Sequence, residues 1–298
     1  MTKLLFSSPD LRVYLLADSR FMLDGGAMFG VVPKVLWEKL IMPDADNRIP
    51  MGTHCLLVQT AEATVLVNTG IGNKYSQEFV ERYQIDTSTN LLDALSEIHI
   101  QPDAVTHVIL THLHFDHSGW NTCVTANNSL ATTFPQARYY VQKAEWETAI
   151  NPPNSRLRAS YLPDNILPIE PQLTLVEGNI QITSEVSVQL TQGHSDGHQI
   201  VRIQLPMDYS ANKHLQPRTR EIVYFSDLIP TTLHLPLPYC MAYDIYPLQT
   251  INQKKKLLDN IHDHQALTVF EHEVTHPVAY LKKTGKYFSI DPVTLSDI

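Results

Sequence analysis

Apolar and polar positions follow short, regular patterns over the first third of the chain. Residues 54–60 and 64–68 are rich in apolar and β-branched side chains and flank a short turn, which predicts a pair of strands. Apolar residues at positions 91, 92, 95 and 98 have helical spacing, and Asn90 is suited to cap that helix. The apolar run at 105–111 then predicts a buried strand.

The same alternation of strands and helices continues to residue 270. Strands are expected at 138–142, 180–183, 186–191, 199–205, 221–225 and 267–270, and helices at 143–150 and about 250–262. The proline-rich stretch 151–171 predicts an irregular insertion or lid loop. No linker of flexible composition divides the chain, so we expect one layered α/β domain over 1–298.

Composition narrows the class of protein. The 298 residues are 43% apolar and 18% charged, and the formal net charge of −9 argues against a nucleic-acid partner held by counterion release. No apolar run approaches the roughly 18 residues of a membrane span, and the apolar part of the first nine residues is too short for a signal peptide. We therefore expect a soluble, cytoplasmic protein without a membrane partner. The three cysteines form no Cys-x-x-Cys pair, which argues against both a disulfide framework and a thiolate zinc site.

The distribution of the 14 histidines carries the chemical information. His112, His114, Asp116 and His117 lie within six positions, directly after the strand predicted at 105–111. Side chains two apart on an extended segment point to the same side, so His112 and His114 can bind one metal ion. Asp116 and His117, on the following turn, can reach a neighbouring ion.

Three further candidate ligands also follow predicted strands. His194 comes after the strand at 186–191, Asp227 after 221–225, and His272, between Glu271 and Glu273, after 267–270. Loops at strand ends of an α/β sheet often gather a site, and imidazole and carboxylate groups bind divalent metals. Their shared position favours convergence on one site.

In this order, the cluster 112–117 and then His194, Asp227 and His272 resemble the five motifs of the metallo-β-lactamase superfamily. Asn68-Thr69-Gly70 is similar to its Asp-Thr-Gly element. The resemblance implies a four-layer αβ/βα sandwich with a two-metal site at one edge of its two sheets. The metals would be two divalent ions, commonly zinc and sometimes iron or manganese. By position, the resemblance implies that His112, His114 and His194 bind one ion, that Asp116, His117 and His272 bind the other, and that Asp227 bridges them.

Within the superfamily the chain is most similar to the lactonase and organophosphate-hydrolase branch. Residues 24–30 resemble the segment that lines the lactonase substrate pocket, where Met28 and Phe29 would offer an apolar wall to an acyl chain. Two ions about 3.5–4 Å apart would supply a bridging hydroxide near neutral pH. Asp116 or Asp227 would hold or relay the proton. The expected substrate is a small lactone or ester such as an acyl-homoserine lactone.

Two positions depart from the family pattern in ways that bear on mechanism. Position 68 is Asn instead of Asp, which places a neutral amide where a carboxylate would orient a metal ligand. Position 230 is Pro, whereas lactonases of this kind usually place a catalytic Tyr three residues after the bridging Asp. His234 is our nominee for the missing catalytic group. Asn68 and His198 are candidates to orient metal-bound histidines.

Two other functions stay open at this point. A phosphotriester or phosphodiester hydrolase, including a tRNA-processing nuclease, would use the same ligands, although the acidic charge suits a polyanion poorly. A non-catalytic binding protein whose fold is stabilised by metals would be expected to bind each ion with four protein ligands, usually including Cys, and to leave no open coordination position. Seven ligands for two ions leave open coordination positions, which favours catalysis. The sequence is compatible with a homodimer.

Overall fold

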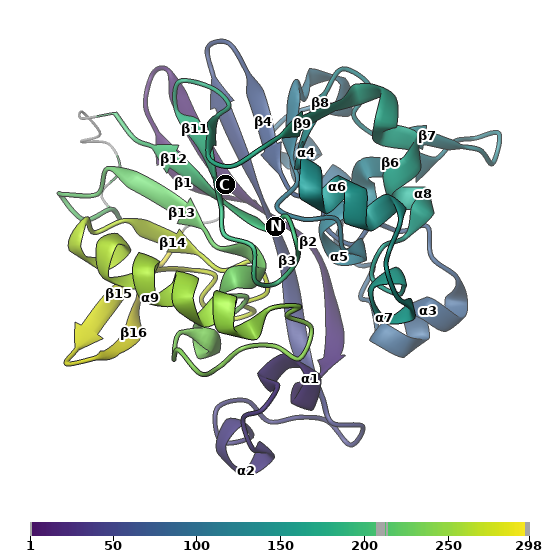
Figure 1. The fold of residues 1–298 in the computed structure, drawn as a ribbon. Coiled ribbons are helices and arrows are strands. Elements are labelled where there is room, and N and C mark those ends of the chain that lie inside the picture. The colour runs from purple at the N-terminus through teal and green to yellow at the C-terminus, as the bar shows by residue number, and fades with distance from the viewer. Residues whose placement is uncertain (1, 207–211, 213, 296–298) are drawn as a thin grey trace.

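The computed structural model describes residues 2–206, 212 and 214–295, and its core is a pair of facing sheets (Figure 1). The first sheet has seven strands, in the order β1 (Thr2–Ser7), β2 (Leu11–Asp24), β3 (Arg48–Thr60), β4 (Thr64–Val67), β5 (His107–Ile109), β8 (Arg138–Gln142) and β9 (Leu173–Val176). The second, also of seven, runs β10 (Ile180–Gln181), β11 (Val186–Leu190), β12 (Gln199–Gln204), β13 (Glu221–Tyr224), β14 (Leu267–Val269), β15 (Val278–Thr284) and β16 (Tyr287–Pro292). A separate two-stranded sheet pairs β6 (Thr122–Val124) with β7 (Leu130–Thr132).

Helices cover the sheets and connect them. The α-helices are α1 (Gly25–Phe29), α2 (Lys34–Trp37), α3 (Gln77–Tyr83), α4 (Leu91–Glu97), α5 (Phe115–Ser118), α6 (Lys143–Ile150), α7 (Ser155–Arg158), α8 (Pro163–Ile166) and α9 (Pro247–Asp263). Short 3-10 helices are η1 (Pro102–Ala104), η2 (Gly119–Asn121), η3 (Leu167–Gln172), η4 (Ser226–Leu228) and η5 (Thr232–His234).

Alternating side chains build the four layers. In β4, Val65 and Val67 point into the core between the sheets, while Leu66 packs on the opposite face with α4 and α6. In β13, Ile222 faces the core between the sheets and Val223 packs against α9. Figure 1 shows α9 lying over the second sheet. The layers are therefore helix, sheet, sheet, helix, as the resemblance implied.

Most elements expected from the sequence are present near their predicted bounds. The strand at 138–142 and the helix at 143–150 match the prediction, and α9 is longer than expected by three residues at its start. No individual strand was predicted at β1, β2, β9, β15 or β16. In β2 the apolar pattern is broken where the pairing with β3 shifts register between Ala17 and Arg20, because buried Asp18 lies there.

The stretch 151–171 is more regular than the sequence indicated. It forms α7, α8 and part of η3, so the expectation of an irregular loop was wrong for these segments. Asn154 caps α7 by accepting a hydrogen bond from the Leu157 backbone amide (3.1 Å). Pro163 begins α8, and because the first N–H groups of a helix have no partner within it, the missing N–H of proline costs no helical hydrogen bond.

The candidate site lies where parallel strands end. β4, β5, β8 and β9 are parallel, and so are β13 and β14. The backbone of β3 joins the two sheets here, since the amides of Gly52 and His54 donate to the carbonyls of His272 (3.0 Å) and Glu271 (3.1 Å). The loop after β14 is thereby attached to a strand of the first sheet.

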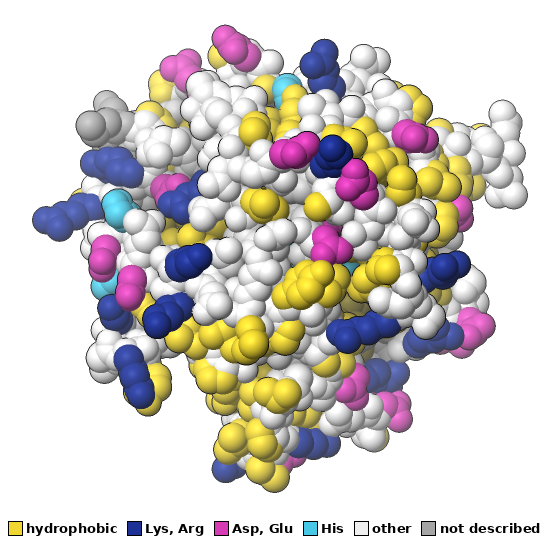
Figure 2. Space-filling view, viewed as in Figure 1, with side chains coloured by type: hydrophobic (Ala, Val, Ile, Leu, Met, Phe, Trp, Pro, Cys, Tyr) yellow, Lys and Arg dark blue, Asp and Glu magenta, His cyan; other side chains and the backbone are white. Residues whose placement is uncertain are grey.

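Apolar side chains gather at the lower end of the molecule, over α1 and α2 (Figure 2). The most exposed of them are Val31, Val35 and Met42, with 91%, 62% and 80% of their surface accessible. No described helix has the length and apolar character to cross a membrane.

Candidate metal centre

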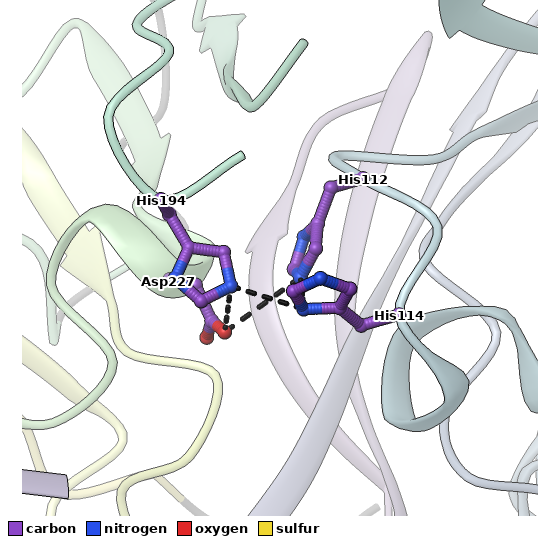
Figure 3. Close-up of side chains that lie close together, drawn as sticks. All are labelled: His112, His114, His194 and Asp227. Atoms are coloured by element: carbon purple, nitrogen blue, oxygen red, sulfur yellow. Dashed lines mark hydrogen bonds and ion pairs between the residues drawn. The ribbon is translucent and has the colours of Figure 1, made fainter. Parts of the chain in front are cut away.

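Four of the predicted ligands converge on one point, and we call them the first cluster: His112, His114, His194 and Asp227. The Nδ1 atom of His114 lies 3.1 Å from the Nε2 atoms of both His112 and His194. Asp227 Oδ2 lies 3.1 Å from His194 Nε2 (Figure 3). All four residues are buried, so the ring nitrogens face one another and a carboxylate in place of bulk water.

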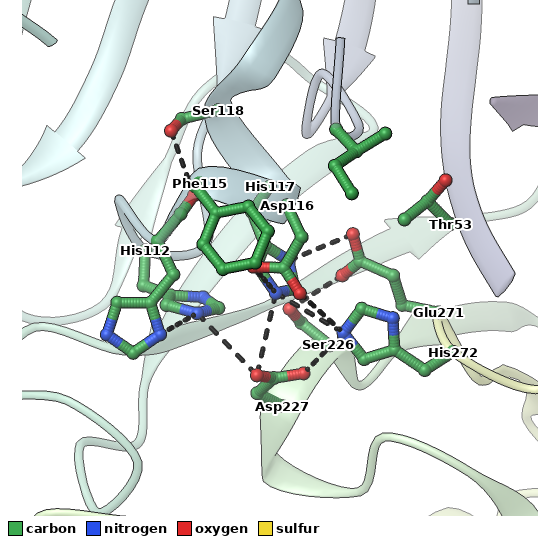
Figure 4. A network of polar contacts seen from close by, with 12 residues as sticks. Thr53, His112, Phe115, Asp116, His117, Ser118, Ser226, Asp227, Glu271 and His272 are labelled. Atoms are coloured by element: carbon green, nitrogen blue, oxygen red, sulfur yellow. Dashed lines mark hydrogen bonds and ion pairs between the residues drawn. The ribbon is translucent and has the colours of Figure 1, made fainter. Parts of the chain in front are cut away.

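The other three predicted ligands, Asp116, His117 and His272, form the second cluster. The Nε2 atoms of His117 and His272 are 3.3 Å apart, and Asp116 lies 3.6 Å from each of them. Asp227 reaches both clusters, because its Oδ1 is 3.0 Å from His272 Nε2 (Figure 4). The structure therefore brings all seven predicted ligands together and places Asp227 between the groups.

The hydrogen-bond partners of the second cluster fix which ring nitrogens carry protons. His272 Nδ1 donates to the carbonyl of Gly52 (2.8 Å), and His117 Nδ1 donates to Glu271 Oε1 (2.9 Å). In their neutral forms both rings then present Nε2 lone pairs to each other. Asp227 Oδ1 likewise has no hydrogen-bond donor. Facing lone pairs beside a carboxylate attract a cation, either protons or a metal ion, and imidazole nitrogens with carboxylate oxygens suit a divalent transition metal.

The histidines of the site have pKa values that are shifted in opposite directions. Burial lowers the pKa of His112 and of His114 well below its usual value, helped by the neighbouring rings. Burial would also lower the pKa of His272, but the charge of Asp227 outweighs it and raises that pKa to about 9. The pKa of His117 is raised well above its usual value because Glu271 and Asp116 outweigh its burial. The site therefore attracts positive charge most strongly at the second cluster.

Glu145, at the start of α6, holds together two loops that bear ligands. Its Oε1 accepts from the Leu113 amide (2.9 Å), and its Oε2 accepts from Ser195 Oγ (2.5 Å) and from the Gly197 amide (3.1 Å). A Cβ on Gly197 would lie 2.5 Å from that of Glu145, so only glycine fits. His112, His114 and His194 thus owe their mutual placement to one buried carboxylate.

Asp244 supports the first cluster in a similar way. Its Oδ1 lies 2.9 Å from His194 Nδ1 and accepts that proton, which leaves His194 Nε2 free to face the site. Sequence reasoning assigned no role to Asp244 or Glu145, and Glu271 was noted only as a neighbour of His272. Asp244 is 50 residues from His194, and Glu145 is 32 residues from Leu113 and 50 from Ser195, so no local pattern marks them.

His234 lies away from the reacting region. Its ring stacks on Phe29 with 4.9 Å between centroids, its Nδ1 accepts from Thr231 Oγ1 (2.8 Å), and its Nε2 donates to the Met28 carbonyl (2.9 Å). Burial lowers the pKa of His234 to about 4, so the ring is neutral. The structure shows His234 tying η5 to α1. Its catalytic role stays a prediction that this geometry does not favour.

His198 and Asn68 lie next to the predicted ligands. The His198 ring centroid is 5.3 Å from that of His112, and its Nδ1 contacts Thr191 Oγ1 at 2.7 Å. Asn68 Nδ2 lies 3.1 Å from His117 Nδ1. Of the two, only Asn68 is within hydrogen-bonding distance of a ligand nitrogen among the contacts of the described residues.

A cavity of about 440 Å³ opens onto both clusters. Its lining consists of Leu23, Met28, Tyr83, His114, Phe115, Asp116, Arg156, Leu157, Ala159, Ser160, His194, Asp227, Met241, Ala242, Tyr243 and His272. Met28 therefore lines the cavity as the resemblance implied. Phe29 does not, because it is fully buried between Trp37 and His234.

Comparison with known proteins gives consistent matches. The family model of the metallo-beta-lactamase superfamily matches residues 48–207. An N-acyl homoserine lactonase of Bacillus thuringiensis is 29% identical over 203 residues, which cover 65% of this chain and 70% of that protein.

Solved structures resemble the whole chain. A probable metal-dependent hydrolase from Staphylococcus aureus superposes with a TM-score of 0.86 at 29% identity, over 98% of this chain and 99% of that one. AidC, a dizinc quorum-quenching lactonase, superposes with a TM-score of 0.74 at 24% identity, over 99% of each chain. At that identity the second likeness supports the fold alone.

Proposed function

The chain belongs to the metallo-beta-lactamase superfamily and is a metal-dependent hydrolase, and from this premise we propose that it hydrolyses lactones, with acyl-homoserine lactones as the model substrate. We propose that two divalent ions, zinc in the first instance, occupy the first and second clusters. The similarity to N-acyl homoserine lactonases supports this substrate class.

The observation that carries the proposal is the cavity and its position. Leu23, Met28, Leu157 and Met241 give it an apolar wall, and Asp227 and His272 stand at its inner end. An apolar wall that ends at a polar, charged floor suits an ester carbonyl joined to an acyl chain. A phosphodiester would bring its negative charge towards the carboxylates of Asp116 and Asp227.

The residues of the clusters have separate tasks in this proposal. Bound divalent ions supply Lewis acidity, which lowers the pKa of water and polarises the carbonyl. Asp227 would hold both clusters at a fixed separation through its two oxygens. Asp116 lines the cavity, so its carboxylate is placed to receive a proton from the attacking water and return it to the leaving alkoxide.

Pro230 has no phenol group, and its contact at the site is made by its backbone carbonyl. The Pro230 carbonyl accepts a hydrogen bond from the His272 amide (2.9 Å), which fixes the loop of that ligand. The lining of the cavity contains the phenol groups of Tyr83 and Tyr243. Burial raises the pKa of both, so they stay protonated at neutral pH and can donate to a developing oxyanion.

We propose that the stretch 151–171 acts as the cover of the cavity within a single domain. Arg156, Leu157, Ala159 and Ser160 of this stretch line it. The Arg156 guanidinium also donates to the carbonyl of Ala242, which is another residue of the lining. This contact joins the cover to the segment that carries Met241 and Tyr243.

A matched substrate panel tests the proposal. The metal-loaded protein is assayed for kcat/KM with acyl-homoserine lactones of increasing acyl length, γ- and δ-lactones, an aryl phosphotriester and a bis-aryl phosphodiester. We expect the lactones to be preferred and kcat/KM to rise with acyl length, because each buried methylene contributes about 0.8 kcal/mol. Asp227→Ala serves as the inactive control for contaminating esterases.

Two results would overturn the proposal. A phosphodiester kcat/KM about tenfold or more above that of every lactone would contradict the substrate class. A reproducible metal content near one equivalent per chain under metal-replete conditions would contradict the two-ion centre. A preference for the phosphotriester would replace the lactone with that substrate class and leave the metal centre standing.

A further inference from the structure

Glu271 is a fully buried carboxylate beside the second cluster. Its exposed surface is 0%, and no ion pair in the described part of the chain joins it to Lys or Arg. Its partners are Asn68, Ser226 and His117: Ser226 Oγ donates to Oε2 (2.8 Å), and His117 Nδ1 donates to Oε1 (2.9 Å). A buried charge of this kind is costly unless each oxygen is hydrogen-bonded, and here both are.

The amide of Asn68 has one orientation that fits its surroundings. The Thr111 backbone N–H, which can only donate, lies 2.9 Å from Asn68 Oδ1. The amide nitrogen must then face Glu271, and it lies 3.0 Å and 2.8 Å from Oε1 and Oε2. Asn68 adopts a positive φ of 57°, which asparagine and aspartate tolerate better than most residues.

These contacts connect position 68 to His117 through Glu271, and Figure 4 shows Glu271 beside His117. Glu271 accepts a hydrogen bond from the Nδ1–H group of His117. The Nε2 atom of His117 therefore faces Asp116, Asp227 and His272. An acceptor behind a metal-binding histidine sets its tautomer, its ring orientation and its basicity. At this site the acceptor comes from the strand end after β14, on the second sheet, while Asn68 follows β4 on the first.

We propose that Asn68 and Glu271 are a complementary pair in which Glu271 is the positioning carboxylate for His117 and Asn68 is the amide that accommodates it. The inference rests on the proposed metal centre, because His117 is positioned for an ion that the second cluster holds. It predicts that the carboxylate and the amide can exchange places. It also predicts that either change alone is harmful.

The geometry of position 68 supports the exchange. Asn68 Nδ2 is already 3.1 Å from His117 Nδ1, so N68D would place a carboxylate oxygen within reach of that ring proton. In the single variant this oxygen would also lie about 3 Å from both oxygens of Glu271, with two buried carboxylates in contact. Adding E271Q supplies an amide in the place of that second carboxylate. The double variant then has one carboxylate and one amide, as the natural chain has.

The test compares N68D, E271Q and the double variant N68D/E271Q with the natural chain. Zn²⁺ affinity is measured for the metal-free proteins by competition with a chromogenic chelator, and Co²⁺ spectra report the geometry around the ion. We expect each single variant to bind the weaker-held Zn²⁺ about 10–100-fold less tightly. The double variant should recover to within about threefold of the natural chain and regain its Co²⁺ spectrum.

A neighbouring carboxylate provides the matched control. The Glu273 carboxylate accepts hydrogen bonds from Thr232 and from the backbone amide of Thr275, and among the described residues it makes no hydrogen bond to a predicted ligand. E273Q should change thermal stability without the loss of Zn²⁺ affinity, and N68D should not rescue it. Thermal unfolding of the metal-free proteins separates folding from metal binding, since the exchange should also restore the midpoint that either single variant lowers.

The outcomes separate this inference from the proposed function. A natural chain that binds no divalent ion contradicts both. A natural chain that binds two ions, together with a double variant that binds them no better than the weaker single variant or does not fold, contradicts the exchange alone. Full Zn²⁺ affinity in E271Q contradicts it as well, because the positioning carboxylate would then be dispensable.

Discussion

The two clusters of the candidate metal centre contain similar side chains but are supported by different groups. In the first cluster, His194 is backed by the carboxylate of Asp244 and His112 contacts the hydroxyl of Thr111 at 3.2 Å. In the second, His117 is backed by Glu271 and Asp116 adds another carboxylate. With Asp227 reaching both clusters, the first has three imidazoles, whereas the second has two imidazoles and the further carboxylate of Asp116, so the second is the more acidic.

This difference predicts different metal preferences. The lowered pKa values of His112 and His114 mean that protons compete little for these two rings of the first cluster, whereas Asp227 and Asp244 raise the pKa of His194. At the second cluster the raised pKa values of His117 and His272 mean that an ion must displace protons. Carboxylate-rich sites suit harder ions and imidazole-rich sites suit zinc. We therefore expect the second cluster to exchange its ion more readily for Mn²⁺ and to depend more on pH.

The largest effect should come from the residue that the clusters share. Asp227→Ala removes the only carboxylate that lies within 4 Å of ligands in both clusters among the described ion pairs. Both ions should be lost or weakened, and kcat/KM should fall by more than the roughly 100-fold typical of changes behind the ligands. Metal analysis after gel filtration and a lactone assay measure the two losses. Full activity in this variant would assign the bridging role to another carboxylate.

A pair of variants should next separate the clusters. His114→Ala removes a ligand of the first cluster only, and Asp116→Asn removes a carboxylate of the second only. Each protein should retain about one equivalent of metal per chain, compared with about two in the natural chain. Titration with Zn²⁺ and then Mn²⁺ should show that Mn²⁺ competes better in His114→Ala. Equal loss of both ions in both variants would mean that the clusters form one inseparable unit.

A smaller effect is expected for the group behind His194. Asp244→Asn keeps the shape of the side chain but removes its charge from the first cluster. Affinity for the ion of that cluster should fall about 10–100-fold, while the ion of the second cluster is retained. Competition with a chelator gives the two affinities separately. A loss confined to the second cluster would contradict the division drawn here.

The last prediction concerns the pH dependence of stability instead of metal affinity. Since the folded-state pKa of His272 is raised from 6.5 to about 9, its proton stabilises the metal-free fold below about pH 6.5, and this contribution is lost as pH rises towards 9. The metal-free protein should therefore lose about 3 kcal/mol over this range. Bound metal replaces the proton, so the loaded protein should show a flatter profile. Urea unfolding at several pH values measures both curves.

The order of the motifs made the predicted ligands accessible to sequence analysis. Each ligand follows an apolar strand, and an unbroken apolar run such as Val65 to Val67 indicates a strand that is buried on both faces. The long strand β2 was harder to predict, because Asp18 interrupts its apolar pattern. Asp18 is buried, and it accepts hydrogen bonds from the Ile71 amide (2.7 Å) and from Trp120 Nε1 (2.8 Å), neither of which is near it in the sequence.

The supporting carboxylates could not be predicted for the same reason. Glu145 lies in an ordinary helix, and only the folded chain brings it to Ser195 and Gly197. At position 68 the sequence suggested a lost carboxylate. The structure shows that Glu271, 203 residues away, lies against the Asn68 amide and supplies a carboxylate to the same histidine. A departure from a family motif at one position can therefore be understood only with its partner in space.

The distribution of ligands over the two sheets has a consequence for biosynthesis. His272 follows His117 by 155 residues, so at about 5–20 residues per second it leaves the ribosome roughly 8–30 s later. During that interval the nascent chain presents the ligands from the loop after β5 without His272. The centre can close only after the loop that follows β14 has been translated. The metal content of newly made protein should therefore reflect which ions the cell supplies at that moment, as well as the affinities of the finished site.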